Sequence, residues 1–234
     1  MPVMDAQQLA GLTARARRLA GPGHLSADTG PAASAGDRPD AGRPPARRVL
    51  GIAGPPGAGK STLAAALVDR LGGLAVLVPM DGFHLAQAEL NRLGRAGRKG
   101  APDTFDATGY AALLARLRAP EPDAVVYAPA FDRSLEEPVA GSIAVAPGTP
   151  LVITEGNYLL HDDGPWAPVH ALLDEVWFLE LDPVTRVRRL VDRHVRHGKD
   201  RPYAERWVRE SDEANARLVE RGRHRADLVV SLCD

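Results

Sequence analysis

Residues 54–62 read Gly54-Pro55-Pro56-Gly57-Ala58-Gly59-Lys60-Ser61-Thr62. All but the last match the pattern G-x-x-x-x-G-K-[S/T], which is the Walker A phosphate loop. An apolar run at 49–53 before the loop predicts a buried strand, and the Ala- and Leu-rich run at 61–71 after it, ended by two glycines, predicts a helix. A chance glycine-rich turn before a helix is the alternative, but strand, loop and helix follow in the order that a phosphate loop requires. The sequence therefore predicts an α/β protein that binds a nucleoside triphosphate.

The residue types of the loop fit this chemistry. Gly57 and Gly59 let the backbone approach a phosphate and adopt dihedral angles that a side chain would forbid. The backbone N–H groups then point at the anion at the positive end of a helix. Lys60 is expected to reach the β- and γ-phosphates, and the hydroxyl of Ser61 is expected to bind Mg²⁺. We expect the whole stretch from Gly54 to Thr62 to bind the nucleotide.

The chain has 234 residues, enough for a sizeable core. Its 29 Lys and Arg residues nearly balance its 30 Asp and Glu residues, and the net charge of −1 argues against a nucleic-acid binder. The one cysteine, Cys233, cannot form an internal disulfide, so a reducing compartment is expected. No apolar run approaches the roughly 20 residues of a membrane helix, and no apolar signal core is present near the N-terminus. We therefore expect a cytoplasmic protein without a membrane partner.

Residues 1–20 predict a short amphipathic helix, because one helical face carries Leu9, Leu12, Ala16 and Leu19. Such a helix binds a membrane surface or a partner, or it packs on the core of its own chain; we favour packing. Residues 21–47 contain almost no large apolar residue and cannot offset the entropy of ordering, so a flexible linker is expected. Arg47 is expected to be a solvated flank of the first strand. Residues 48–234 are expected to form the main domain.

A second predicted strand, at 74–80, ends at Asp81-Gly82-Phe83-His84. Ligands of open parallel α/β sheets bind at the carboxyl ends of the strands. Asp81 is therefore a candidate general base that accepts the proton of a substrate hydroxyl. The alternative is an ordinary helix cap, because Asp is favoured before a helix such as the one predicted at 85–90. Motifs further along the chain favour the functional interpretation.

Two further segments belong to the predicted pocket. Residues 94–106 form a basic, Gly-rich loop that ends in acids and an aromatic residue; a solvated basic turn is the alternative. A helix predicted at 108–118 is followed by an extended piece at 125–133, for which 143–145 is the expected partner strand. These two strands predict a small β-excursion that could form one wall of a substrate pocket.

A short apolar strand begins at Leu151 and ends near Glu155, in the manner of a Walker B motif. The carboxylate would hold Mg²⁺ directly or through water. One apolar strand that ends in Glu is a weak signal by itself, but the Walker A loop upstream makes it persuasive. Further buried strands are predicted at 176–181 and 226–232.

Pro183 opens a predicted helix rich in basic residues, namely Arg186, Arg188, Arg189, Arg193, His194, Arg196 and His197. The functional interpretation is a lid that brings an arginine over the transferring phosphoryl group and excludes water. A solvated arginine face and an RNA-binding patch are the alternatives, and the near-zero net charge and the lack of interleaved aromatic residues argue against RNA. A last helix is predicted at about 203–221.

These motifs resemble those of the P-loop small-molecule kinases that include uridine kinase, phosphoribulokinase and type I pantothenate kinase. The resemblance covers about residues 48–232 and rests on the Walker A loop and on three further strings. They are Met80-Asp81-Gly82-Phe83-His84, Arg98-Lys99-Gly100-Ala101-Pro102-Asp103-Thr104-Phe105-Asp106 and Ile153-Thr154-Glu155-Gly156. The string at 98–106 is similar to one in the pantothenate kinases. The segment 211–215, with its spacing from His194, resembles the short branch of nucleoside or fructose-transport-system kinases.

The resemblance implies a P-loop NTPase fold with a five-stranded parallel sheet and helices on both faces. It also implies ATP with Mg²⁺ and transfer of the γ-phosphoryl group to an alcohol. By resemblance, Asp81 is the catalytic acid or base, Glu155 is associated with the metal, and Arg193 or Arg196 is a lid arginine that acts with Lys60. The acceptor-binding residues that it implies are His84, Lys99, Phe105, Asp106, Tyr127, Asp132, Asn157 and Asn215.

We therefore expect an ATP-dependent kinase that acts on a hydroxyl of a small polar metabolite, such as a nucleoside, a pantothenate-like compound, a sugar or a glycerate-like acid. A nucleoside monophosphate kinase is the first alternative; its acceptor is a phosphate, so it would not need an acid at Asp81. A non-catalytic ATP-binding regulator is the second alternative. A homodimer would be ordinary for such an enzyme, although no feature of the sequence indicates an interface.

Overall fold

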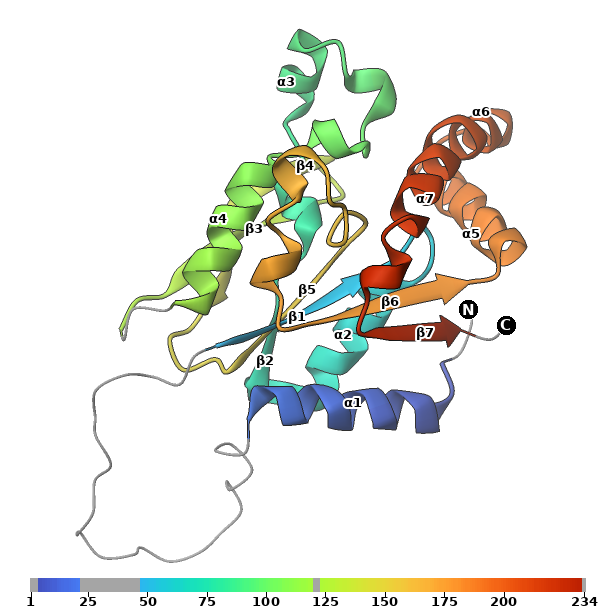
Figure 1. Cartoon of the computed structure of the whole chain (residues 1–234). Coiled ribbons are helices and arrows are strands. Elements are labelled where there is room, and N and C mark those ends of the chain that lie inside the picture. Colours follow the sequence, from blue (N-terminus) through green and yellow to red (C-terminus); the bar gives the residue numbers. More distant parts are fainter. Residues whose placement is uncertain (1–3, 22–46, 120–122, 233–234) are drawn as a thin grey trace, which may run out of the picture.

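The computed structural model describes residues 4–21, 47–119 and 123–232. Its centre is a five-stranded parallel sheet in the order β2-β5-β1-β6-β7 (Figure 1). The strands are β1 (Arg48–Ala53), β2 (Ala75–Leu77), β5 (Leu151–Gly156), β6 (Glu175–Leu181) and β7 (Leu228–Leu232). β1, β5 and β6 are mostly apolar and almost wholly buried, as expected for parallel strands with both faces covered.

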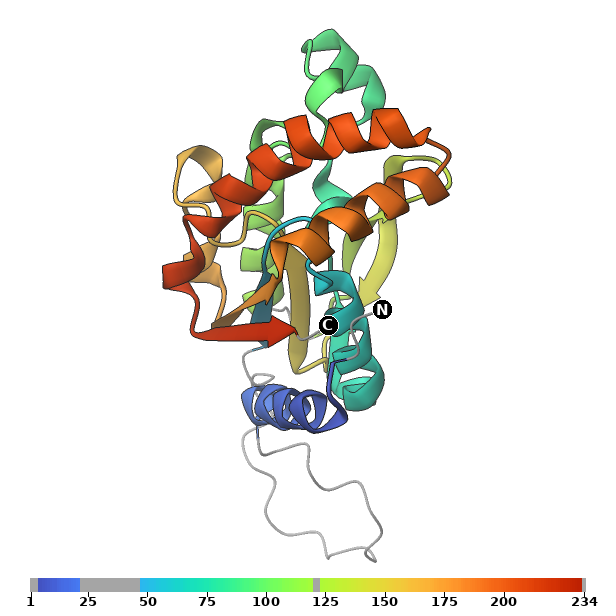
Figure 2. The ribbon, with the colours of Figure 1, turned by 90° about the vertical axis from the view of Figure 1, so that its right-hand side faces the viewer.

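Helices cover both faces of this sheet. α1 (Ala6–Ala20) and α2 (Lys60–Leu71) lie on one face, and α4 (Ala107–Arg118) lies on the other (Figures 1 and 2). The buried cluster on the first face includes Leu12, Ala16, Leu50, Ile52, Leu67, Ile153, Trp177 and Leu179. The cluster on the second face includes Val49, Tyr110, Leu113, Leu114, Val152, Phe178 and Val219. The predicted P-loop fold with a five-stranded parallel sheet and helices on both faces is therefore confirmed.

The N-terminal helix packs on its own chain. α1 contacts α2, and Leu12 and Ala16 are buried between α1 and the sheet. This arrangement agrees with packing on the core, which we favoured over a membrane-surface or partner-binding helix. The predicted linker at 21–47 lies outside the described residues, apart from Gly21 and Arg47 at its two ends. Among the helices of the described segments, none is long and apolar enough to cross a bilayer.

A hairpin and a group of helices extend beyond the sheet. The antiparallel hairpin of β3 (Val126–Asp132) and β4 (Glu137–Val145) contacts the turn at Met80–Phe83 that follows β2, and a short helix, α3 (Gln87–Arg92), comes after that turn. The hairpin matches the predicted β-excursion.

α5 (Pro183–Arg196), α6 (Arg201–Trp207) and α7 (Glu213–Glu220) lie together beyond the carboxyl end of β6, as both ribbon views show (Figures 1 and 2). The helix predicted at 203–221 is not continuous. A π-helical turn at Val208–Asp212 separates α6 from α7. Turns of this kind occur often at functional sites because they change which side chains face inward.

Arg47 corrects one expectation from the sequence. Its side chain is not solvated but only 2% exposed. The guanidinium donates hydrogen bonds to the carbonyl oxygens of Thr149 at 2.9 Å, Leu117 at 3.1 Å, Ala146 at 2.7 Å and Pro147 at 3.2 Å. It therefore ties the start of β1 to the end of α4 and to the turn before β5.

Replacing Arg47 by Met is expected to lower the free energy of unfolding by about 3 kcal/mol, because the buried carbonyl groups lose their donors. The measurement is the urea midpoint at an unchanged slope. Arg48→Met is the matched control, since the Arg48 side chain is 52% exposed and its partner Asp174 also accepts from Arg118. Equal destabilisation by both variants would contradict the structural role of Arg47.

Candidate functional site

The phosphate loop connects β1 to α2 in a conformation that excludes side chains. Gly54 and Gly57 have φ angles of 148° and 81°, in a region that favours glycine. A Cβ atom on Gly54 would lie 2.4 Å from the carbonyl oxygen of Leu179, and one on Gly57 would lie 2.7 Å from Cγ of Leu190. The loop is therefore held between β6 and α5, and its glycines are needed for this close packing.

Lys60, the first residue of α2, is buried under the loop. Its Nζ donates hydrogen bonds to the carbonyl oxygen of Pro55 at 3.1 Å and to Oδ1 of Asn157 at 2.8 Å. Burial lowers the pKa of Lys60 to about 8, although the charges of Glu155 and Asp81 act in the opposite direction. An additional anion bound beside this ammonium group would therefore raise its pKa toward the usual value.

Ser61 and Glu155 meet where β5 ends beside α2. The Ser61 hydroxyl donates a hydrogen bond of 2.8 Å to Oε1 of Glu155. Burial raises the pKa of the Glu155 carboxyl, and the nearby Asp81 carboxylate adds to the rise, whereas Lys60 opposes it. Behind Glu155, the Thr154 hydroxyl donates to the carbonyl oxygen of Val78 at 2.6 Å, which fixes the end of β5 against the segment that follows β2.

Asp81 lies in the 3₁₀ turn that follows β2. Its Oδ2 accepts a hydrogen bond of 3.0 Å from Nη2 of Arg133, at the tip of the β3–β4 hairpin. Asp81 does not cap α3, because the backbone N–H of Gln87 at the start of that helix donates to the carboxylate of Glu137 instead. The helix-cap alternative for Asp81 is therefore not what the structure shows.

The two α5 arginines that are candidates for the lid have different surroundings. Burial lowers the pKa of Arg193, whereas the charges of Asp212, Asp81 and Glu155 raise it. In the described part of the chain, no carboxylate lies within ion-pair distance of Arg193. Arg196 is exposed and donates to the carbonyl oxygen of Asp192 within its own helix, at 3.3 Å. The charge of Arg193 also acts on Lys60 of the phosphate loop.

Two arginines near the site have surroundings that the sequence does not reveal. Arg186 is 5% exposed and contacts the phosphate loop through the carbonyl oxygen of Pro56, at 3.3 Å; it also pairs with Glu213 at 2.5 Å. Arg133 was not among the predicted site residues. Its only signal is its place at the polar tip of the predicted extended piece, which does not indicate the contact with Asp81.

Other predicted residues shape a wall of the pocket. The His84 ring lies 4.0 Å from the Phe105 ring and 4.9 Å from the Phe131 ring, measured between centroids. Asn215 donates from Nδ2 to the carbonyl oxygen of Gly100 at 3.3 Å, and the Tyr158 hydroxyl donates to the same oxygen at 2.5 Å. These contacts attach the loop at 94–106 to α7 and to the end of β5.

Three predicted acceptor-binding residues have other surroundings. Asp106 caps α4 by accepting a hydrogen bond from the Gly109 N–H at 2.8 Å. Asp132 accepts from the backbone N–H and hydroxyl of Ser134, which stabilises the hairpin turn. Tyr127 is 59% exposed. Within the described segments none of the three forms a hydrogen bond or ion pair with the phosphate-loop residues or with Asp81.

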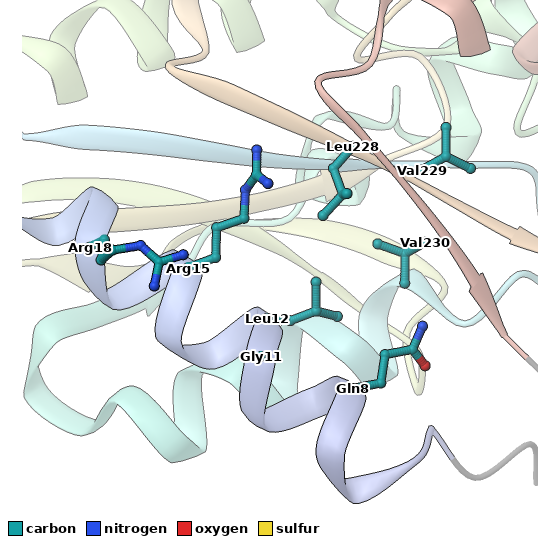
Figure 3. A pocket seen from close by; sticks show the side chains of 8 residues that line it. All are labelled: Gln8, Gly11, Leu12, Arg15, Arg18, Leu228, Val229 and Val230. Atoms are coloured by element: carbon teal, nitrogen blue, oxygen red, sulfur yellow. The ribbon is translucent and has the colours of Figure 1, made fainter.

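A surface hollow of about 360 Å³ lies elsewhere, between α1 and the edge strand β7 (Figure 3). Its lining consists of Gln8, Gly11, Leu12, Arg15, Arg18, Leu228, Val229 and Val230. None of these residues belongs to the site at the phosphate loop. The hollow is therefore a feature of how α1 packs beside the sheet, distinct from the site described above.

Comparison with known proteins identifies relatives along most of the chain. A uridine kinase-like protein of Schizosaccharomyces pombe is 36% identical over 196 residues, which cover 79% of this chain and 83% of the relative. An ATP-dependent kinase-like protein of Aspergillus versicolor is 39% identical over 147 residues, which cover 58% of this chain and 84% of the relative.

The crystal structure of a fructose-transport-system kinase-like protein from Silicibacter sp. TM1040 has a TM-score of 0.71 and 41% identity, over 81% of this chain and 92% of that one. No protein-family model matches the chain. The relatives, the Walker A loop and the five-stranded parallel sheet nevertheless agree with one another and with the resemblance inferred from the sequence. The chain belongs to the P-loop kinases that are related to uridine kinase.

Proposed function

We propose that the protein transfers the γ-phosphoryl group of Mg·ATP to a hydroxyl group of a small polar metabolite. The position of Asp81 carries this proposal, because its carboxylate acts electrostatically on Lys60, Glu155 and Arg193 and does not cap α3. Phosphoryl transfer depends on positioning and charge stabilisation, together with a group that orients or deprotonates the attacking nucleophile. A carboxylate in this place supports an alcohol as the acceptor rather than a phosphate.

The phosphate groups of ATP would bind to the loop and to the basic side chains around it. The backbone N–H groups at the start of α2 favour an anion through the positive end of the helix. Lys60 would move its hydrogen bonds from Pro55 and Asn157 to the phosphate oxygens. Arg193, which has no carboxylate partner among the described residues, would stabilise the negative charge that develops in the transition state.

The residues at the end of β5 fit a magnesium ion. Mg²⁺ prefers oxygen ligands and is commonly bound by one or two protein groups together with substrate phosphates. Ser61 and Glu155 offer a hydroxyl and a carboxylate that already contact each other, and the described segments contain no group of three or more His, Cys, Asp or Glu side chains that would hold a metal alone. When bound, the ion would neutralise phosphate charge and orient the triphosphate.

Asp81 would act on the acceptor. In the proposed reaction, its carboxylate accepts the proton of the acceptor hydroxyl while that oxygen bonds to the γ-phosphorus, and the bond from this phosphorus to the bridging oxygen of ADP breaks. The contact with Arg133 holds the carboxylate in one orientation before the acceptor binds. Helices α5 to α7 would exclude water from the transferring group.

ATP binding is expected to take up a proton above pH 8. Because burial places the pKa of Lys60 at about 8 in the free protein, most of this side chain is neutral at pH 9. The triphosphate raises the pKa again, so binding at pH 9 takes up about one proton, whereas at pH 7 the ammonium is already formed. The dependence of the calorimetric binding enthalpy on the ionisation enthalpy of the buffer, with ATP in EDTA, measures this uptake. Equal uptake at both pH values would contradict the assignment to Lys60.

The test of the proposed function is ADP formation from Mg·ATP across nucleosides, pantothenate, sugars, glycerate and nucleoside monophosphates. Acceleration by one alcohol that disappears in Asp81→Asn would support the proposal. Acceleration by a monophosphate that survives this substitution would identify a nucleoside monophosphate kinase instead. Tight ATP binding with no acceleration by any compound would favour a regulator that binds ATP without catalysis.

A further inference from the structure

Two cations share one aromatic ring beside Asp81. Nζ of Lys99 lies 5.4 Å from the centroid of the Phe131 ring, and Cζ of Arg133 lies 5.0 Å from the same centroid. The His84 ring packs on Phe131 as well, at 4.9 Å. The cluster of His84, Lys99, Phe131 and Arg133, hereafter the cationic cluster, joins the turn after β2 to the loop at 94–106 and to the hairpin.

The two cations of the cationic cluster, Lys99 and Arg133, differ in their partners. Arg133 pairs with Asp81, but across the described residues no carboxylate lies within ion-pair distance of Lys99. In the part of the chain that the structure describes, its Nζ donates to the carbonyl oxygen of Glu136 at 2.8 Å and to Oε1 of Gln87 at 3.4 Å.

Two neighbouring acids form hydrogen bonds with backbone groups. Glu137 accepts from the first N–H of α3, and Asp132 accepts from the turn at Ser134. Arg133 therefore has one carboxylate partner, and Lys99 has none within ion-pair distance among the described residues, so an anion at this place would pair with Lys99.

The place of the cationic cluster points to the acceptor rather than to ATP. In the proposed function, the triphosphate would have its own cations, namely Lys60 under the loop and Arg186 and Arg193 on α5. The cationic cluster lies on the hairpin side of Asp81, to which it is joined by the contact of 3.0 Å from Arg133. A group held by Lys99 and Arg133 would accordingly lie close to the hydroxyl that Asp81 deprotonates.

We propose that the acceptor is a compact anionic alcohol, whose carboxylate or phosphate group is bound by Lys99 and Arg133 near the reacting hydroxyl. This inference rests on the proposed function and names the chemical class of its acceptor. The guanidinium of Arg133 can make bidentate contacts with either anion, and Lys99 would add a point charge. Binding of the anion draws Arg133 away from Asp81, so the carboxylate becomes free to accept the hydroxyl proton.

The experiment compares neutral and anionic members of matched pairs at saturating Mg·ATP: glycerol with D-glycerate and with glycerol 3-phosphate, and ribose with ribose 5-phosphate. We expect kcat/KM to be at least about tenfold higher for the anionic members than for the neutral ones. Lys99→Met should lower kcat/KM by about 10- to 100-fold for the anionic members alone, because a charge-assisted contact is lost. Lys99→Arg should restore much of the loss. Arg92→Gln is the control, since Arg92 pairs with Glu89 on the surface of α3.

The outcomes separate this inference from the proposed function. If the protein prefers anionic alcohols and Lys99→Met abolishes this preference without changing the KM for ATP, both the inference and the proposed function are supported. A preference for the carboxylate or for the phosphate member then identifies the anion. Equal use of neutral and anionic alcohols overturns the inference alone. An increase of the KM for ATP in Lys99→Met, without an effect on the acceptor, also overturns it, because the cations would then serve the triphosphate. No acceleration by any alcohol removes the proposed function and the inference with it.

Discussion

Asp81→Asn is expected to lower kcat by about 10³-fold, as loss of a general base does, while ATP binding stays nearly unchanged. Asn has the size of Asp and keeps a hydrogen-bond acceptor for Arg133, but it cannot take up the proton of an alcohol. ADP formation with the best acceptor measures kcat, and calorimetry measures the Kd for ATP. A loss in kcat and kcat/KM by the same factor would show that the carboxylate acts in the transition state.

Two controls separate catalysis from folding in this experiment. The pair of Asp81 with Arg133 is partly exposed, so its loss should change the free energy of unfolding by less than about 1 kcal/mol. Asp192→Asn is the matched variant, because Asp192 forms a surface pair with Arg201 on the outer helices. Full activity of Asp81→Asn would remove Asp81 from its catalytic role and reopen the nucleoside monophosphate alternative.

The sequence predicts those parts of the site whose residues are neighbours in the chain or directly follow a predicted strand. The phosphate loop needs glycines, a lysine and a hydroxyl within a few residues of each other. In such loops this run leads into the N-terminus of a helix. Asp81 and Glu155 could be found because each directly follows an apolar strand, and the carboxyl ends of parallel strands meet at one edge.

The remaining parts depend on contacts between distant segments. Arg193 and Arg196 have similar neighbours in the sequence, and only the packing of α5 against the loop turns the first toward the acids and the second to solvent. The sequence shows Arg47 only as a flank of a strand, because its carbonyl partners near 117 and 149 are brought to it by tertiary structure. The contact of Arg133 with Asp81 likewise exists only once the hairpin folds over the sheet.

The same reasoning explains why two predicted acceptor residues form local hydrogen bonds. Asp106 and Asp132 each precede a helix or a turn, and a carboxylate in that position bonds the backbone N–H groups that follow it. Local hydrogen bonds of this kind compete with any role in ligand binding, and sequence strings shared with a family do not show which of the two prevails.

Lys60→Met is expected to weaken ATP binding and to lower kcat/KM on the order of 10³-fold, since Met fills the same space without a charge or a donor. The depressed pKa of Lys60 shows that burial of its ammonium group is unfavourable in the free protein. Removing that charge should therefore cost little stability, and the loss of ATP binding cannot be attributed to unfolding. Calorimetric titration with ATP and a urea unfolding curve on the same preparation measure the two effects.

Asn157→Ala distinguishes the charge of Lys60 from its position. This variant removes the acceptor at 2.8 Å from Nζ but leaves the ammonium group and its contact with Pro55. If the charge provides the binding energy, Asn157→Ala loses much less ATP affinity than Lys60→Met does. If both lose the same amount, the orientation of Nζ by Asn157 is as important as its charge. Full activity and normal ATP affinity in Lys60→Met would contradict nucleotide binding at this loop, because no other buried lysine is present in the described chain to replace it.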